Sequence, residues 1–143
     1  MTEIASKKHY GQIVEIWQEA FGDETDFIEE FLTDFADCTA VYSENGKALG
    51  IVSLLPVFCG EEKGRYIYAL AVRKTHRGRG IGKNLVGFAK EYIKKCKEAF
   101  LVLVPEDKGL FDFYEKQGFF SVACTGKRDI TAMDCGFDAE EIS

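Results

Sequence analysis

Two segments near the N-terminus have apolar residues at helical spacing. In the first, three- and four-residue steps connect Ile13, Ile16, Trp17, Ala20 and Phe21. This period predicts an amphipathic helix over residues 6–21, with Ser6 as its N-cap and Gly22 at its end. In the second segment a Phe recurs every fourth residue, which predicts a shorter helix over 26–35 whose aromatic row packs against a core.

The middle of the chain changes to the pattern of extended strands. Residues 39–43 and 48–55 flank the dipeptide Asn45-Gly46, which favours the positive φ angles of a tight hairpin turn. A second turn at 60–64 leads into residues 65–72, whose last seven residues form an almost continuous apolar run. Such a run predicts a strand that is buried on both faces.

The helical period returns over residues 80–95 and is followed by an apolar strand at 99–104. A strand, a crossover helix and a second strand predict a right-handed βαβ unit with parallel strands. A short helix at 108–116 and a hairpin of strands 119–125 and 128–135 around Gly126 complete the chain. The predicted fold class is α/β, in the sense of an α+β mixed sheet with helices on both faces.

Length and composition limit the class of protein. A chain of 143 residues, 46% of them hydrophobic, suits one domain over 1–143. The longest nearly apolar run, residues 49–58, is much shorter than the ~20 residues of a membrane-spanning helix. The N-terminus has no apolar stretch typical of a signal peptide, so we expect a cytoplasmic protein without a membrane partner.

Cysteine and histidine usage argues against a metal centre. The five cysteines are an odd number without a C-x-x-C pair, and the two histidines are far apart without Cys or carboxylate at ligand spacing. We expect reduced, mostly buried cysteines and no metal.

Charge is distributed unevenly. The net charge is −6, yet residues 73–83 (RKTHRGRGIGK) contain five basic residues and no acidic one. Proteins that bind nucleic acid usually spread basic residues over a whole face, because affinity grows with the number of phosphates neutralised. One short basic segment on an acidic chain suits one small polyanion, so no nucleic-acid partner is expected.

The basic segment lies between a predicted core strand and the start of a helix. A helix N-terminus presents unpaired N–H groups that bind phosphates, and glycines let the backbone approach an oxyanion closely. A Walker A loop would need Gly and Ser or Thr where Arg77 and Asn84 stand. A dinucleotide-binding G-x-G-x-x-G would need Gly where Lys83 or Leu85 stands. Both phosphate-loop assignments therefore fail.

The motif that does fit is R-x-x-G-x-G, formed by Arg77, Gly80 and Gly82. With this motif, the later segment 113–119 (FYEKQGF) and the order of elements, the chain resembles the GNAT superfamily of acyl-CoA-dependent N-acyltransferases. The resemblance covers nearly all of residues 3–135. It implies a central, mostly antiparallel sheet with one parallel strand pair splayed around acetyl-CoA, the co-substrate whose acetyl group passes to a primary amine in a ternary complex.

The resemblance also implies a set of coenzyme-binding residues. Backbone groups of Ala71 and Val72 would pair with the pantetheine arm, in the gap between this strand and residues 99–104. The diphosphate would bind backbone N–H groups of six residues: Arg77, Gly78, Arg79, Gly80, Gly82 and Lys83. Arg73, Lys74 or Lys83 would reach the 3′-phosphate, and the Val72 N–H would stabilise the thioester oxygen as it gains charge.

Acyl transfer from a thioester to an amine needs a proton acceptor and a proton donor. The resemblance makes Tyr114 the candidate general acid, whereas its position three residues after Phe111 also suits a core aromatic. The positions of the family's base are occupied here by Tyr66 and Tyr68. Ionising a phenol at pH 7 costs ~4 kcal/mol, so we expect the amine proton to leave through ordered water, relayed past these hydroxyls.

Two departures from the family, and one alternative function, remain open. Many family members have Asn and a small residue where this chain has Asp107 and Leu110. Because a carboxylate cannot donate a hydrogen bond, the contact of Asp107 with the coenzyme is in question. A non-catalytic acyl-CoA-binding or regulatory domain is the alternative to an enzyme.

No motif identifies the acceptor of the acetyl group. A small metabolite, an antibiotic, a peptide N-terminus and a protein lysine all remain open as the amine. An acidic surface would steer polyamines or other cationic amines toward it, but acidity is also common among soluble proteins, so both interpretations stay open. Exposed strand edges are compatible with a homodimer.

Overall fold

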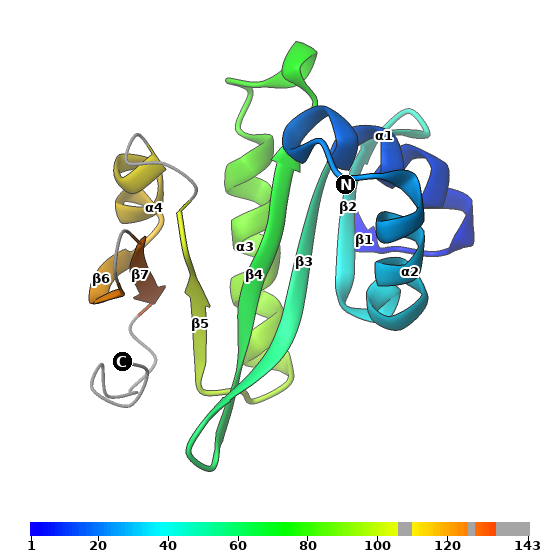
Figure 1. The fold of residues 1–143 in the computed structure, drawn as a ribbon. Helices are drawn as coiled ribbons and strands as arrows, with labels where there is room; N and C mark the ends of the chain where they lie inside the picture. The colour runs from blue at the N-terminus through cyan, green and yellow to red at the C-terminus, as the bar shows by residue number, and fades with distance from the viewer. Residues whose placement is uncertain (106–109, 126–127, 134–143) are drawn as a thin grey trace. The chain divides into compact units, whose positions relative to one another are not determined.

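A computed structural model describes residues 1–105, 110–125 and 128–133 of the protein. The strands are β1 (Thr2–Ile4), β2 (Thr39–Glu44), β3 (Lys47–Cys59), β4 (Glu62–Val72), β5 (Phe100–Leu103), β6 (Phe119–Thr125) and β7 (Arg128–Met133). The helices are α1 (Tyr10–Phe21), α2 (Thr25–Phe35), α3 (Ile81–Lys95) and α4 (Phe111–Lys116), with 3-10 turns at Lys7–His9, Ala36–Cys38 and Lys74–His76. Figure 1 shows these elements.

The sheet is mixed, as the sequence predicts. Its seven strands are hydrogen-bonded in the order β1-β2-β3-β4-β5-β7-β6. β1 and β2, β2 and β3, β5 and β7, and β6 and β7 are antiparallel pairs, whereas β4 and β5 are parallel. The predicted βαβ unit is therefore confirmed, with α3 as the crossover between the two parallel strands.

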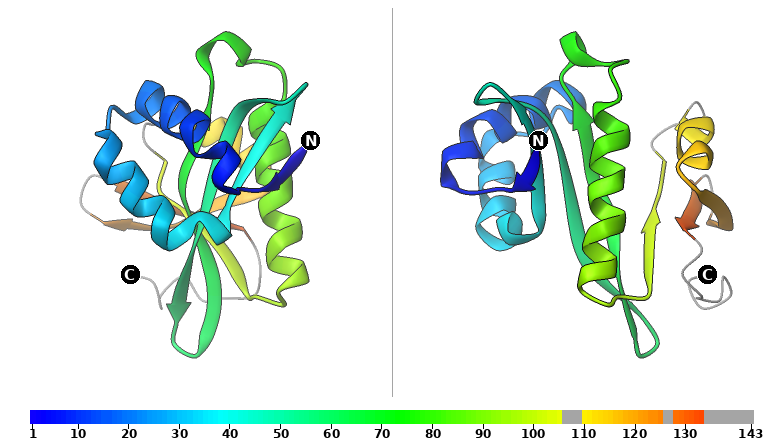
Figure 2. Two further views of the ribbon diagram at one scale, coloured as in Figure 1. Left: turned by 90° about the vertical axis from the view of Figure 1, so that its right-hand side faces the viewer. Right: turned by 180° about the vertical axis from the view of Figure 1, so that it is seen from behind.

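The chain divides into two compact units. The first comprises Met1–Leu55 and Tyr68–Ala89. In this unit α1 and α2 cover one face of the strands and the first half of α3 covers the other, as the views from front and behind show (Figure 2). Buried apolar side chains of α1 and α2 form one core cluster with residues of β2, β3 and β4.

β3 and the first turns of α3 approach each other closely at Gly50. A Cβ at Gly50 of β3 would lie 2.9 Å from the Leu85 side chain, 3.0 Å from that of Ile81 and 3.1 Å from the Ala71 carbonyl. Only glycine fits there without a shift of its neighbours. The first turns of α3 consequently lie directly against the sheet beside the end of β4.

The second unit comprises Pro56–Ile67 and the described part of Lys90–Ser143. Here Gly64, Arg65 and Tyr66 of β4 are in parallel register with Phe100, Leu101 and Val102 of β5. Arg65 forms a bidentate ion pair with Glu98, at 2.8 and 3.1 Å, and its guanidinium lies over the Tyr92 ring. This buried, fully hydrogen-bonded pair ties β4 to the segment before β5.

Most helix and turn boundaries agree with the sequence prediction. Gly22 ends α1 in the left-handed conformation (φ 75°), and Asn45 and Gly46 adopt the positive φ angles, 52° and 78°, of the predicted hairpin turn. The N-terminal prediction needs one correction. Ser6 caps the 3-10 turn at Lys7–His9, and α1 itself begins at Tyr10 after His9.

Three strands differ from the prediction. β4 begins at Glu62, inside the predicted turn 60–64, and not at Arg65. β3 continues past Pro56 to Cys59, although proline usually interrupts a strand. The register of β2 with β3 ends at the Thr39–Ser53 pair, so Pro56 lies beyond the end of β2, where its missing N–H leaves no β2 carbonyl without a donor. β1 was not predicted at all, because three residues carry too little pattern.

None of the helices in the described ranges is long and apolar enough to cross a lipid bilayer.

Candidate functional site

The candidate site is built on the loop between β4 and α3. After Val72 the chain makes a 3-10 turn at Lys74–His76, and α3 starts at Ile81. The Gly80 carbonyl accepts the Asn84 N–H at 3.0 Å, which is the first hydrogen bond of the helix. The N–H groups of residues 81–83, which precede Asn84, therefore have no acceptor within the helix. This first turn of α3 contains no acidic residue.

Glycines give this loop its conformation. Gly78 and Gly80 have φ angles of 80° and 81°, which L-residues with a Cβ rarely adopt. A Cβ at either position would meet nothing within 4 Å, so both are required by the backbone conformation and not by crowding. The combination of two left-handed glycines and a helix N-terminus makes a backbone surface that can accept an anion.

Carboxylates from elsewhere in the first unit hold the cationic loop. Arg73 donates to the Ala48 carbonyl at 2.7 Å and to Glu15 of α1 at 3.3 Å. The backbone N–H of Lys74 donates to Glu19, one helical turn further along α1, at 2.6 Å. Two carboxylates on one face of α1 thus fix the start of the loop.

A third carboxylate holds the other end of the loop. The Arg79 guanidinium pairs with Glu44 of β2 at 3.2 Å, and the Tyr42 hydroxyl donates to the same carboxylate at 3.0 Å. The hydrogen bond from Tyr42, and then the charge of Arg79, lower the pKa of Glu44. The same hydrogen bond raises the pKa of Tyr42.

These three carboxylates were missed by sequence reasoning. Glu15, Glu19 and Glu44 lie 35 to 58 positions away from the loop residues to which they are hydrogen-bonded. No local motif connects them with the loop. The absence of acidic residues between 73 and 83, next to a strongly acidic remainder, was the only signal that partners had to come from elsewhere.

The end of β4 is already occupied by a side chain of the loop. Arg77 donates from Nε to the Val72 carbonyl at 3.2 Å. Ala71 is buried and Val72 is half-buried, whereas Gly78, Arg79, Gly80 and Lys83 are exposed and Gly82 is half-buried. Every predicted coenzyme-binding residue thus lies in the first unit, within one strand end, one loop and one helical turn.

Tyr114 lies in the second unit, on α4. Its ring is 7% exposed and makes edge-to-face contacts with Phe113, at 5.0 Å between centroids, and with Phe119, at 5.7 Å. Both predicted roles, core aromatic and general acid, need such a fixed ring. Leu110 precedes α4 and is exposed, and Asp107 falls outside the described residues.

The tyrosines at the positions of the family's base lie in different surroundings. Tyr66 is half-buried in the second unit, opposite Val102 of β5. Tyr68 belongs to the first unit, is 44% exposed and stacks on Phe31. In the part of the chain that the structure describes, no three His, Cys, Asp or Glu side chains gather as metal ligands would.

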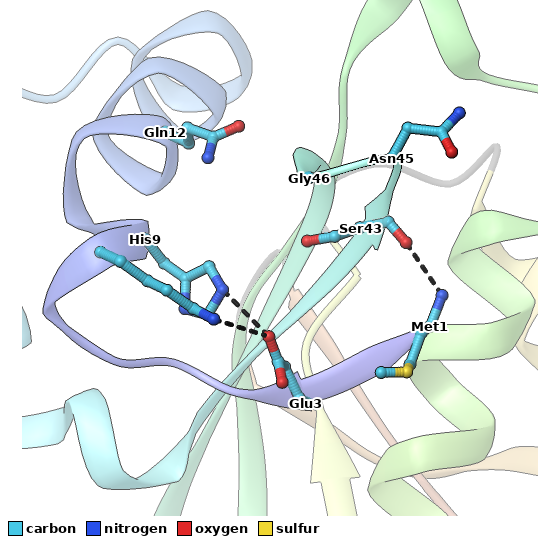
Figure 3. A pocket seen from close by; sticks show the side chains of 8 residues that line it. Met1, Glu3, His9, Gln12, Ser43, Asn45 and Gly46 are labelled. Carbon is cyan, nitrogen blue, oxygen red and sulfur yellow. Dashed lines mark hydrogen bonds and ion pairs between the residues drawn. The ribbon is translucent and has the colours of Figure 1, made fainter.

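A pocket near the N-terminus is lined by polar groups that bind one another (Figure 3). His9 accepts the Ser6 N–H on Nδ1 at 3.0 Å, so its neutral ring carries the proton on Nε2, which points to Glu3 at 3.2 Å. Gln12 accepts the Ala48 N–H at 2.6 Å. These bonds give the buried histidine a structural role at the start of α1.

Comparison with known proteins decides the family. Residues 2–119 match the model of the Acetyltransferase (GNAT) family. The chain belongs to the GNAT acetyltransferase family. As a member of it the chain is an acyltransferase, and the predicted resemblance is confirmed. No curated protein matches the sequence.

Solved structures share this GNAT fold at low sequence identity. The aminoglycoside 6'-N-acetyltransferase from Enterococcus faecium has a TM-score of 0.78 at 14% identity, over 92% of this chain and 95% of that one. Ribosomal-protein-alanine N-acetyltransferase from Brucella melitensis has a TM-score of 0.76 at 16% identity, over 94% and 99%. PaiA N-acetyltransferase from Thermoplasma acidophilum, solved in complex with coenzyme A, has a TM-score of 0.71 at 15% identity, over 94% and 98%.

The hydrogen bond from Tyr42 and the ion pair with Arg79 together make the contribution of Glu44 to stability dependent on pH. Because the pKa of Glu44 is lower in the folded protein than its ordinary value of 4.5, ionised Glu44 stabilises the fold above that value. This contribution is lost as the pH falls through the lowered pKa. We expect Glu44→Gln to be less stable than wild type at pH 7 in urea unfolding, with a difference that shrinks toward pH 3.

The control for this prediction is Glu62→Gln, which removes one exposed carboxylate from the first residue of β4. It should show no such pH-dependent difference from wild type. A destabilisation by Glu44→Gln that is the same at both pH values would contradict the ion-pair account.

Proposed function

We propose that this acyltransferase moves the acetyl group of acetyl-CoA to a primary amine by direct attack within a ternary complex. The observation that carries the proposal is the glycine loop at the N-terminus of α3, where unpaired N–H groups and two left-handed glycines follow directly on the end of β4. The coenzyme A complex of the Thermoplasma protein, which has the same fold, supports it.

The diphosphate is proposed to bind the backbone N–H groups of the loop. Residues 77–80 and the first turn of α3 supply these donors, and the partial positive charge of the helix N-terminus adds to them. Arg73 and Arg79 are held by carboxylates of α1 and β2. Among the described residues Lys74 and Lys83 form no ion pair, so these two ammonium groups are the candidates for the 3′-phosphate.

The pantetheine arm is proposed to pair with Ala71 and Val72 as an added strand. For this, Arg77 has to release the Val72 carbonyl, to which it donates a single hydrogen bond. An exposed hydrogen bond of this kind contributes about 1 kcal/mol, so the exchange costs little. The Val72 N–H then remains as the donor for the thioester oxygen.

The chemical step forms a C–N bond and breaks the C–S bond of the thioester. The attacking amine has to be neutral, and an alkyl ammonium of pKa ~10.4 is ~4.6 kcal/mol from neutrality at pH 7. We propose that its proton leaves to ordered water, and that the Tyr114 hydroxyl protonates the departing thiolate and regains a proton from solvent. Transfer of the acetyl group leaves an amide and free coenzyme A.

The first test concerns the loop. In Gly80→Val the backbone relaxes away from a φ of 81°, and binding has to restore it at a cost of at least 1–2 kcal/mol. We expect the dissociation constant for acetyl-CoA, measured by titration calorimetry, to rise more than about tenfold.

Gly60→Val is the matched control for this test. Gly60 has a φ of 62° and equally open surroundings, but it lies in the turn between β3 and β4. Its substitution should leave the affinity for acetyl-CoA unchanged. Equal losses in the two variants would show that general strain, and not the loop, determines binding.

The second test concerns Tyr114. Replacing it with Phe keeps the ring contacts with Phe113 and Phe119 and removes only the hydroxyl. We expect kcat to fall by ~10² or more with little change in the KM for acetyl-CoA, because a general acid acts in the transition state.

Tyr10→Phe removes a hydroxyl from a partly buried ring of α1 and should leave kcat unchanged. Wild-type turnover in Tyr114→Phe would make Tyr114 a packing residue and would leave the thiolate to be protonated by water.

A further inference from the structure

A group of aromatic rings in the first unit includes Trp17, Phe27, Phe31 and Tyr68, with Phe21 and Phe35 also in ring contact. Trp17 of α1 lies 4.9 Å from Phe31 and 6.4 Å from Phe27 of α2, and 6.0 Å from Tyr68 of β4, between ring centroids. The rings of Phe31 and Tyr68 are stacked at 5.3 Å with 17° between their planes. We call Trp17, Phe27, Phe31 and Tyr68 the ring cluster.

The ring cluster is buried at its base and open to solvent at its edge. Trp17 is 1% exposed and Phe31 9%, whereas Phe27 is 45% and Tyr68 44% exposed. Two large rings are therefore presented to solvent on a support of packed rings. Their exposed area is far below the ~800 Å² that each partner of a stable protein complex buries, so it suits a small ligand.

The charge around the ring cluster is negative. Neither Lys nor Arg occurs between Lys8 and Lys47, whereas Asp and Glu recur throughout that stretch. In the described part of the chain no basic side chain pairs with the carboxylates of α2, which are Asp26, Glu29, Glu30 and Asp34. At the turn before α2, Asp23 accepts the indole N–H of Trp17 at 2.8 Å.

Partly exposed aromatic rings in a negative field attract one kind of small ligand. A ring face binds an ammonium group electrostatically, and unpaired carboxylates raise the local concentration of cations. A neutral ligand gains nothing from the carboxylates, and an anion is repelled. The chemistry of this surface therefore selects a cation with an apolar chain.

The position of the ring cluster relates it to the proposed reaction. Tyr68 and Val72 lie on the same strand, four residues and therefore about 13 Å apart. The Val72 N–H is the proposed donor to the reacting thioester. An acceptor with one amine at Val72 would reach the ring cluster with a second group only if it is long enough to span this distance.

We propose that the ring cluster binds a second positive charge of the amine acceptor, so that the substrate class is a linear diamine or polyamine. This inference rests on the proposed function, because it takes Val72 as the place where the acetyl group is transferred. The Cα atoms of Tyr68 and Val72 lie about 13 Å apart, so the two nitrogens of such a substrate have to span a distance of this order.

The test compares acceptors that differ in length and in terminal charge. Acetylation is followed by release of the coenzyme thiol with α,ω-diaminoalkanes of increasing length, n-alkylamines of matching length and the corresponding ω-amino acids. We expect the KM of the diamines to fall once the chain spans the distance, to about a tenth of that of the matched monoamine, and the ω-amino acids to be the poorest. Equal KM values for matched diamines and monoamines would overturn the proposal.

Ring variants distinguish a specific effect on the KM of the long diamine from a general effect on activity. Phe27→Leu and Tyr68→Leu keep apolar volume but remove a ring face, so each should raise the KM of the long diamine about three- to tenfold. They should change the KM of the monoamine much less. Tyr68→Phe keeps the ring and should keep the low KM. The matched control is Phe58→Leu, at an exposed ring of β3 in the second unit.

The carboxylates are tested in the same way. Glu30→Gln removes one negative charge from α2 and should raise the KM of the long diamine, most clearly at low salt. Glu61→Gln removes the same charge from the exposed turn between β3 and β4 and should not. An equal rise in the KM of the long diamine in the two variants would contradict the proposal that the carboxylates of α2 attract the second charge.

Binding can also be followed without turnover. Trp17 is the single tryptophan of the chain and a member of the ring cluster, so its fluorescence reports on this surface. We expect the long diamine to change it in wild type and not in Tyr68→Leu, with no acetyl-CoA present. A signal that depends on protein concentration and not on diamine would identify a second copy of the chain as the occupant and overturn the proposal.

The two proposals fail in different ways. If acetyl-CoA binds and amines are acetylated regardless of a second charge, the inference falls and the proposed function stands. If the diamine changes Trp17 fluorescence but no amine is acetylated, the proposed amine acetylation is contradicted. The inference that the ring cluster binds an acceptor is then contradicted as well.

Discussion

The candidate site depends on holding a cationic loop at the start of α3 while the N–H groups of that helix end stay free of side-chain acceptors. Arg73, Arg79 and the basic residues between them repel one another, and the loop depends on two glycines in the left-handed conformation. Glu15, Glu19 and Glu44 compensate from outside, by bonding the loop on the side of α1 and β2. The first turn of α3, where an acidic side chain would compete with a phosphate, stays free of carboxylates.

Because basic residues are concentrated in the loop and acidic residues elsewhere, the chain has two surfaces of opposite charge. The loop concentrates positive charge for a polyanionic coenzyme, and the same carboxylates that hold it belong to a strongly acidic N-terminal half. On α2 the acidic residues have no basic partner in the described ranges, and the same helix carries Phe27, which is exposed. Opposite charge on neighbouring elements of the first unit is what two substrates of opposite charge require, an anionic acyl donor and a cationic acceptor.

Local pattern was enough for most of the fold. The helical period of α1, α2 and α3 and the Asn45-Gly46 turn were predicted because each is determined within a few residues. β1 and the extension of β3 past Pro56 depend on where β2 begins and ends, which no local pattern contains. The glycine loop could be found from its motif, whereas its carboxylate anchors and the ring cluster of Trp17 and Tyr68 are formed by tertiary contacts.

The central claim is that backbone amides at the start of α3 bind a diphosphate, and amide NMR shifts test it most directly. Coenzyme A and pantetheine share the thiol arm, but only coenzyme A carries the diphosphate. Titration with coenzyme A should move the amide resonances of residues 77–83 strongly, and titration with pantetheine should leave them near their free positions. If coenzyme A binds without moving these resonances, or if pantetheine moves them equally, the account is contradicted.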